Sequence, residues 1–169
     1  MKSVVLKRMA IAIIAVVTMS ASAVAQKQGD MAAGGNLLIG MGDSYTNIGI
    51  GAKFFYNLTD PIRLAGEFDY FLKKDYQTMW DFSVYGHYLF PVADKLVAYP
   101  SVGLGLVGWK SSFDFGYLSA SASSNDFALS LGGGVDYALT PTLALNGELR
   151  YKIMDGSRLN IVVGVAYKF

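Results

Sequence analysis

Ionisable residues occupy every second position in several segments of this 169-residue chain. Glu67 and Asp69 alternate with apolar residues in one segment, and Glu148, Arg150 and Lys152 do so in another. Side chains two positions apart lie on the same face of an extended strand, so each group lines one face of its strand. Carboxylates and cations enclosed on such faces can pair into an ionic network or gate a narrow pore, and the sequence alone leaves both interpretations open.

His87 is the only histidine in the sequence and the side chain best suited to acid–base chemistry near neutral pH. Ser83 precedes it by four positions on the same strand face, which suggests a hydrolase only if the two side chains can meet. Four residues of an extended strand span about 13 Å, more than the hydrogen-bond distance that a nucleophile and its base require. We therefore predict that His87 is a structural histidine held by a neighbour. With one histidine and no cysteine, the sequence predicts no catalytic residue, no cofactor and no metal site.

The elements that hold these residues are predicted to be short strands. Segments of about ten residues with alternating apolar and polar positions are separated by turn residues such as Thr59 and Pro61, a pattern typical of a membrane barrel. Beyond residue 25 no apolar run reaches the roughly 20 residues of a spanning helix, so a membrane would be crossed by strands. The eight predicted strands are residues 31–41, 45–58, 62–72, 77–90, 96–109, 126–139, 142–154 and 159–169.

One face of each predicted strand is apolar, and the other carries glycine, polar or ionised residues. In the third strand, Leu64 and Phe68 stand opposite Glu67 and Asp69. A Lys or Arg at mid-bilayer costs roughly 2–4 kcal/mol, so the apolar faces must contact lipid and the ionised faces must be enclosed. Because backbone polar groups find no water in the bilayer core, the sheet has to close on itself. The predicted fold class is all-β, an eight-stranded antiparallel up-and-down transmembrane β-barrel.

The enclosed face collects cations and carboxylates in equal proportion. An eight-stranded barrel is just wide enough for its own side chains to fill, so we expect these groups to pair and to plug the lumen. The alternative is that some pairs gate a narrow porin-like channel for small solutes or ions. The predicted lumen network consists of Lys53, Arg63, Glu67, Asp69, Asp81, His87, Asp136, Glu148, Arg150, Lys152 and Lys168.

The first 25 residues have the features of a cleavable secretory signal peptide. Lys2, Lys7 and Arg8 precede an apolar run, and small residues that end at Ala25 have the spacing of a cleavage site. The remaining residues, 26–169, are the length of one domain. Their net charge is about −2, from 11 basic and 13 acidic residues, and they contain no basic block, so a nucleic-acid partner is not expected.

The last predicted strand identifies a family resemblance. Leu159, Ile161, Val163, Val165, Tyr167 and Phe169 form a wholly apolar face that ends in an aromatic residue. This strand, the hairpin at residues 54–64 and the signal peptide resemble those of small bacterial outer-membrane β-barrel proteins of the OmpA transmembrane-domain and OmpX type.

The resemblance implies a location in the bacterial outer membrane, with lipid and lipopolysaccharide as surroundings. It also implies that Val165, Tyr167 and Phe169 act as a signal to the barrel-assembly machinery. The soluble peptidoglycan-binding domain of full-length OmpA has no counterpart in this sequence, so cell-wall anchoring is not inferred. An up-and-down path places both termini on the periplasmic side.

The connection that begins at Lys110 and ends at Asn125 is the predicted site of any specific surface activity. Phe113, Phe115 and Tyr117 alternate with polar or small residues, so the flanking strands could continue outside the membrane as a hairpin, before residues 119–124 form a flexible tip. Its edge could pair with an extracellular protein or a host surface. We therefore predict a monomeric barrel with a structural or surface-interaction role. A narrow channel is the alternative, and a membrane-embedded lipid-modifying enzyme is a more distant one.

Overall fold

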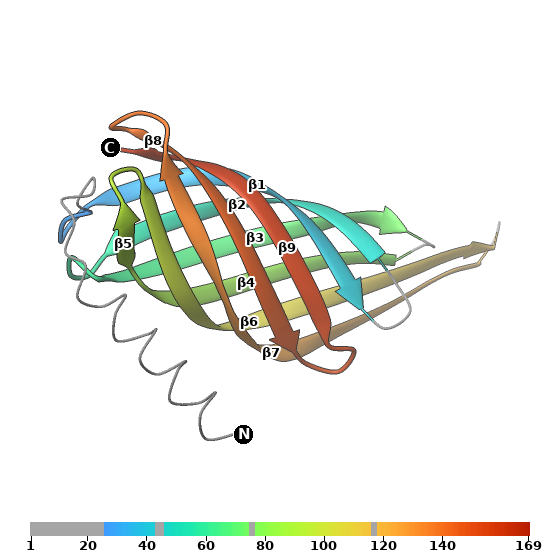
Figure 1. The fold of residues 1–169 in the computed structure, drawn as a ribbon. Coiled ribbons are helices and arrows are strands. Elements are labelled where there is room, and N and C mark those ends of the chain that lie inside the picture. The colour runs from blue at the N-terminus through green and yellow to red at the C-terminus, as the bar shows by residue number, and fades with distance from the viewer. Residues whose placement is uncertain (1–25, 43–45, 75–76, 116–117) are drawn as a thin grey trace, which may run out of the picture.

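A computed structural model describes residues 26–42, 46–74, 77–115 and 118–169 as one closed β-barrel (Figure 1). The predicted signal peptide, residues 1–25, lies outside the described residues. Among the residues that are described, no helix is long and apolar enough to cross a membrane. The strands are β1 (Met31–Gly42), β2 (Thr46–Asn57), β3 (Ile62–Lys74), β4 (Gln77–Tyr88), β5 (Phe90–Ala93), β6 (Leu96–Phe115), β7 (Leu118–Ala138), β8 (Leu143–Ile153) and β9 (Arg158–Lys168).

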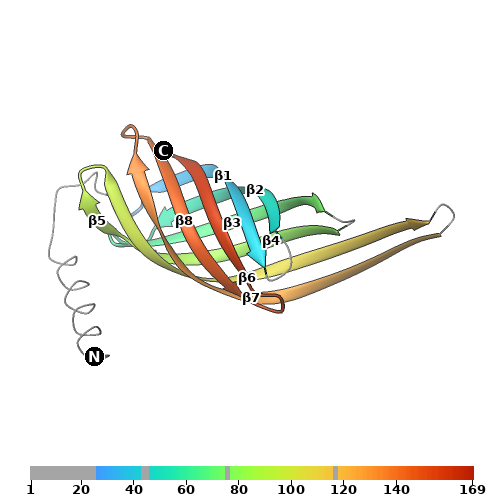
Figure 2. The ribbon, with the colours of Figure 1, turned by 45° about the vertical axis from the view of Figure 1, so that its right-hand side comes forward.

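Every neighbouring pair of strands is antiparallel, and two further pairings close the sheet. β1 pairs with β9, from Ala32 opposite Lys168 to Gly42 opposite Arg158. β4 pairs with β6, which completes the ring. The predicted eight-stranded up-and-down barrel is therefore confirmed. The terminal end of the barrel, where β1 begins and β9 ends, lies opposite the end at which β6 and β7 project (Figures 1 and 2).

The fourth barrel strand is longer than predicted and is divided in two. The sequence predicted a turn over residues 91–95, whereas β5 continues the course of β4 after Leu89 and pairs with β6 in the same register as far as Pro91, before the register shifts at Ala93. Pro91 has no N–H to donate, so it is compatible with a strand end and not with a strand centre. Leu89 lies between β4 and β5, and its N–H donates to the carbonyl oxygen of Pro61, 2.7 Å away, in the turn between β2 and β3.

The hairpin of β6 and β7 bears out the expectation that these strands continue past the rest of the barrel, and it corrects the predicted tip. Both strands pair as far as Phe115 opposite Leu118, so residues 119–124 are strand and not a flexible tip. Figures 1 and 2 show the two strands extending well past the rest of the barrel. Tyr117 lies outside the described residues, and only the backbones of Phe113 and Phe115 are described.

The outer surface is an apolar belt, as the strand patterns predicted. Large apolar side chains on all eight barrel strands are exposed, from Leu37 on β1 to Val163 on β9. Tyr56 and Tyr137 lie near the terminal end, and Tyr70 and Tyr151 lie nearer the opposite end, all of them exposed. Trp80 packs flat on Phe68 with ring centroids 6.3 Å apart. Aromatic rings near both ends of an apolar belt are characteristic of barrels that cross a bilayer.

Apolar and ionisable side chains fill most of the lumen. Towards the projecting hairpin, a buried apolar cluster is formed by Leu38, Phe71, Met79, Val107, Ala128 and Val162. Towards the terminal end, two smaller clusters contain Phe55 and Tyr85, and Leu89 and Tyr99. The ionisable residues lie between and among these clusters. The barrel interior is therefore alternately apolar and charged along its length.

Close packing at the seam between β1 and β9 generates the first prediction. A Cβ added at Gly34 would lie 2.0 Å from the backbone oxygen of Val165, whereas a Cβ at Gly66 would meet nothing within 4 Å. Gly34→Val should therefore destabilise the folded barrel by about 1–3 kcal/mol or more, because a strand has to shift. Unboiled gel electrophoresis after refolding should show a loss of the fast-migrating folded band, and the matched control Gly66→Val should retain it. Equal folding of the two variants would contradict the packing described.

An ion pair at the terminal end joins the two strands of the same seam. Lys168 Nζ on β9 lies 2.5 Å from Asp30 Oδ2, just before β1. Partial burial opposes ionisation of Asp30, but the hydrogen bond from Lys168, with help from Lys27, outweighs it and lowers the pKa of Asp30 below its usual 3.8. A carboxyl group with a lowered pKa stabilises the fold while it is ionised, and that contribution is lost as the pH falls through the folded-state value.

Asp30→Asn should therefore reduce the free energy of unfolding at pH 7 only slightly, by less than about 1 kcal/mol, because the pair is partly exposed and screened by water. The difference between the variant and the parent should shrink as the pH falls from 7 through the lowered pKa of Asp30, because the protonated side chain of the parent is then uncharged like asparagine. Urea midpoints of both proteins over a pH series from 7 down to about 2 provide the measurement. A difference that stays constant over the whole series would mean that charge is not the reason.

Candidate functional site

The structure buries all of the predicted lumen residues except Lys168. The ten others are between 0 and 6% exposed, and they project inward from β2, β3, β4, β7 and β8. Lys168 lies at the terminal mouth and pairs with Asp30 instead. The alternation of side chains along each strand explains this placement, since the strand neighbours of each buried ionisable residue are exposed or half-buried. The buried residues form three clusters.

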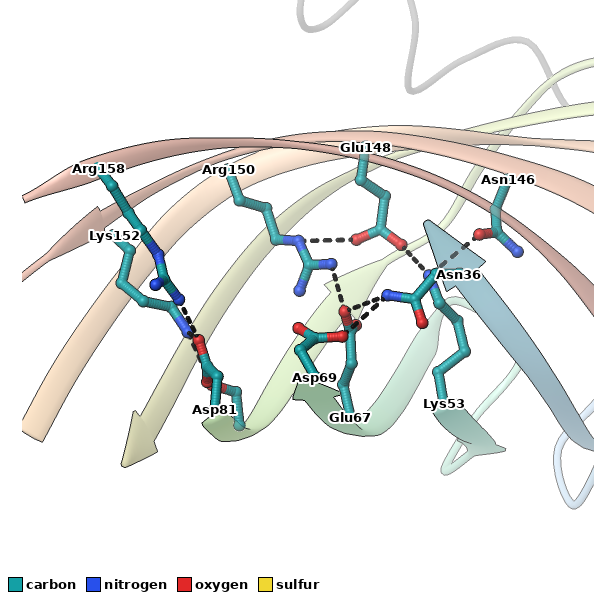
Figure 3. A network of polar contacts seen from close by, with 11 residues as sticks. Asn36, Lys53, Glu67, Asp69, Asp81, Asn146, Glu148, Arg150, Lys152 and Arg158 are labelled. Atoms are coloured by element: carbon teal, nitrogen blue, oxygen red, sulfur yellow. Dashed lines mark hydrogen bonds and ion pairs between the residues drawn. The ribbon is translucent and has the colours of Figure 1, made fainter. Parts of the chain in front are cut away.

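The central cluster joins β1, β2, β3 and β8 across the lumen (Figure 3). Glu148 accepts from Lys53 at 2.9 Å and lies 3.3 Å from Arg150 Nε. Arg150 Nη2 in turn donates to Glu67 at 2.7 Å. Asn36 Nδ2 donates to Glu67 at 2.8 Å and to Asp69 at 3.1 Å. These contacts link residues far apart in the sequence, so they depend on barrel closure.

A second cluster lies nearer the projecting hairpin and is centred on Asp81. Lys152 Nζ and Arg158 Nη2 both donate to Asp81 Oδ2, and Ser83 Oγ donates to Asp81 Oδ1 at 2.6 Å. Arg158 reaches this carboxylate through the apolar cluster, with its guanidinium 4.5 Å from the ring centroid of Phe71. Asp81 therefore balances two cations, while Asp69 makes no ion pair with any described residue.

The third cluster lies nearer the terminal end and is built around Arg63. Its Nη1 donates to Asp136 Oδ2 at 2.5 Å, and its Nε donates to His87 Nδ1 at 3.2 Å. The guanidinium lies between the rings of Phe55 and Tyr99, with centroids 4.3 and 4.7 Å from Cζ. The imidazole of His87 stacks on Tyr99 at 4.5 Å. His87 is thus held by neighbours on both its edge and its face.

Ser83 and His87 are committed to different partners. The Ser83 hydroxyl donates to Asp81, and His87 Nδ1 accepts from Arg63. The two side chains therefore do not form a nucleophile and base pair, which requires a direct hydrogen bond. In the described part of the chain, no three His, Cys, Asp or Glu side chains are grouped so as to hold a metal ion.

The predicted network omitted Arg158 and several neutral polar residues of the lumen. Arg158 was assigned to a turn, yet it is the first residue of β9 and is only 1% exposed. It shares the strand parity of Asn160, so extending the last predicted strand by one residue would have found it. Asn36, Asn146 and Asn160 are also buried and were not in the predicted network because neutral amides carry no charge signal.

The terminal mouth of the barrel contains a cavity of about 80 Å³. Asn57, Arg63 and Asp136 contribute its buried polar groups, and Asp30 and Lys168 contribute to its rim. Gln26 also lines it and accepts a long hydrogen bond, 3.4 Å, from Asn57 Nδ2. The lumen is therefore filled by side chains towards the projecting hairpin and open at the terminal end.

Val165, Tyr167 and Phe169 all point outward on or just after β9. They are 41, 55 and 66% exposed, and Phe169 lies 6.4 Å from the ring of Phe54. Tyr167 pairs with Ala33 of β1 on one side and with Leu143 of β8 on the other. The last strand thus offers an apolar face at the seam of the barrel.

Comparison with known proteins agrees with this architecture. Neisserial surface protein A is 18% identical, with a TM-score of 0.65 over 83% of this chain and 96% of that one. OprG from Pseudomonas aeruginosa is 14% identical, with a TM-score of 0.63 over 87% of this chain and 99% of that one. Ail of Yersinia pestis, crystallised with the heparin analogue sucrose octasulfate, is 18% identical, with a TM-score of 0.61 over 84% and 99%.

No curated protein sequence matches the chain. At the identities given above, the structural likeness supports the fold alone. The family model of the outer membrane protein beta-barrel domain matches residues 9–169, almost the whole sequence. The resemblance to small outer-membrane barrels is thereby confirmed, and the chain belongs to the outer membrane protein beta-barrel domain family.

Proposed function

We propose that this protein is a structural and surface-interaction barrel whose lumen is closed by its paired charges. The observation that carries the proposal is that the pairs span the lumen. Lys53 on β2 binds Glu148 on β8, Arg63 on β3 binds Asp136 on β7, and Lys152 on β8 binds the Asp81 carboxylate on β4. Side chains that bridge non-neighbouring strands occupy the axis of the barrel, where a solute would have to pass.

Energetics support a closed lumen. Breaking a buried ion pair by removing one partner costs about 3–5 kcal/mol, because the remaining charge is left without compensation. A permeating ion would have to part several such pairs and then pass the apolar cluster around Leu38 and Phe71. The apolar cluster offers no hydrogen bonds to replace the hydration of that ion.

The alternative function is a narrow channel. Several buried polar atoms of the lumen have no hydrogen-bond partner among the described residues, including Asn36 Oδ1, Glu148 Oε2 and Arg150 Nη1. Such atoms are compatible with water in the lumen, since buried polar groups usually bind a partner. Water in separate pockets does not require a continuous path, and for this reason the closed barrel is the preferred proposal.

We further propose that the chain has no enzymatic role and acts as a monomer in the outer membrane. In this proposal residues 1–25 direct secretion, and Val165, Tyr167 and Phe169 are recognised by the assembly machinery. Support comes from the family membership and from the exposed apolar face of β9. The terminal end then faces the periplasm, and the β6–β7 hairpin faces outward.

The external hairpin is proposed as the site of surface interaction. Pairing of β7 with β8 begins only at Leu129 opposite Ile153, so β7 from Leu118 to Ala128 has one edge without a strand partner among the described residues. An exposed edge of this length presents backbone donors and acceptors that another protein's strand could bind. Phe127 on this edge is 65% exposed and adds apolar surface.

The closed lumen predicts that the purified protein gives no discrete conductance steps in planar bilayers. Glu148→Ala removes the carboxylate that forms ion pairs with Lys53 and Arg150 but leaves the apolar cluster in place, so it should also remain non-conducting. Asp155→Ala, at an exposed turn residue, is the matched control. Regular steps in the parent protein that change in Glu148→Ala and not in Asp155→Ala would favour the channel.

Deletion of residues 112–124 should leave the barrel folded and abolish its binding to host cells or extracellular proteins. The barrel pairs of β4 with β6 end at Ser111, so the deleted residues lie beyond almost all of the closed sheet. Adhesion of cells that express each form is the measurement, with surface levels matched by labelling and folding checked by heat-modifiable migration. Unchanged adhesion by the deletion variant would refute the role of the hairpin.

A further inference from the structure

The cavity at the terminal end has a largely apolar surface and includes a buried carboxylate among its lining residues. Its walls come from strands on several sides of the barrel and include Ala32, Phe55, Val97, Ala138, Leu143 and Ala166. The buried carboxylate of Asp136 also lines it, with the residue only 6% exposed. Such a cavity can hold a hydrocarbon chain with one polar head.

The hydrogen-bonding state of Asp136 indicates which polar group a ligand in this cavity has to carry. Its Oδ2 accepts from Arg63 at 2.5 Å, but its Oδ1 is buried and has no hydrogen-bond partner among the described residues. An ionised carboxylate can only accept hydrogen bonds. A ligand beside Oδ1 therefore has to supply a donor.

The free oxygen of Asp136 also favours a positive charge on the ligand. Arg63 donates to the other carboxylate oxygen, Oδ2, and directs its Nε and Nη2 towards His87 Nδ1, 3.2 and 3.1 Å away. A carboxylate ligand beside Oδ1 would bring two anions together in a buried site, which is unfavourable. A hydroxyl can donate one hydrogen bond but carries no charge, whereas an ammonium group has three donors and a positive charge, so it matches Oδ1 best.

The same lumen contains a carboxylate that holds two cations. Asp81 binds both Lys152 and Arg158, whereas Arg63 is the one cation that Asp136 binds in the described part of the chain. A second cation on Asp136 would reproduce the arrangement at Asp81. At the rim, Asp30 and Asp94 are balanced by Lys95 and Lys168, so the rim itself selects neither sign of charge.

We propose that this cavity binds a primary ammonium group on a short alkyl stem, with the ammonium donating to Asp136 Oδ1 and the stem lying against Phe55 and Val97. The proposal does not depend on whether the lumen conducts or the hairpin binds. In the periplasm this chemistry is available from a free diamine or from the lysine side chain of a protein. The assignment gives the terminal mouth a binding role separate from the external hairpin.

Isothermal titration of the folded barrel in detergent micelles tests the proposal. Pentane-1,5-diamine should bind, and 1-pentanol, which has a similar stem and a hydroxyl head, should bind at least tenfold more weakly. Nα-acetyl-lysine methylamide distinguishes the sources: binding comparable to that of the diamine indicates a protein lysine, and much weaker binding indicates a free diamine. Either result supports the ammonium site.

Two variants separate the chemistry from folding. Asp136→Asn should lower the affinity for the diamine at least tenfold, and Ala138→Leu should do the same by filling the cavity while the pair of Arg63 and Asp136 stays intact. Asp155→Asn, at the opposite end of the barrel, is the control and should bind normally. Absence of diamine binding to the parent, equal binding of pentanol, or unchanged binding by Ala138→Leu would each overturn the proposal.

Discussion

The absence of water from the bilayer core is the constraint on which the rest of this structure depends. Every backbone N–H and C=O in the membrane needs a partner within the sheet, and only a ring of strands supplies one to each strand. Closure of β1 on β9 and of β4 on β6 meets that requirement. Once the ring is closed with eight strands, its bore is only wide enough for side chains. The contents of the lumen follow from that narrow bore.

Within the bore, charge and shape have to be satisfied together. The cations of the lumen bind carboxylates on other strands, and Arg63 and Arg158 also lie against aromatic rings. Apolar clusters on either side of the central charges exclude water and strengthen the ion pairs, since a low dielectric favours paired charges and penalises unpaired ones. The packed lumen thus stabilises the barrel, and the two ends are left for contact with other molecules. The ends differ, because one carries a long hairpin and the other a cavity with a buried carboxylate.

The projecting hairpin and the terminal mouth are both places where the sheet ceases to be fully paired. The first eleven residues of β7, 118–128, precede the point at which β7 begins to pair with β8. At the other end, β5 is a short continuation of β4 that stops at Ala93. Outside the membrane the backbone can bind water or another chain, so these unpaired stretches are tolerated there and would not be tolerated in lipid. Function in such a barrel is therefore expected at its ends.

The sequence by itself determined the class of fold, the number of barrel strands and the face on which each side chain lies. Side chains alternate between the two faces of a strand, and this alternation can be read from the local sequence. The cost of placing a charge in lipid then decides which face is enclosed. Glu67 and Arg150 could therefore be assigned to the lumen from the sequence. The pairing of those charges could not be assigned. The pairing depends on which residues of distant strands lie at the same position along the barrel axis.

Only the tertiary structure determined those positions along the axis, through the register of every strand with its neighbours. It brought Lys53 to Glu148, and it gave Asp81 two cations while Asp69 makes none of the described ion pairs. It also made residues 119–124 part of a strand where the sequence predicted a flexible tip, because β6 and β7 go on pairing with each other after their other neighbours have ended. The alternation of side chains along one strand says nothing about where a distant strand lies along the barrel axis. Closure of the barrel fixes that position.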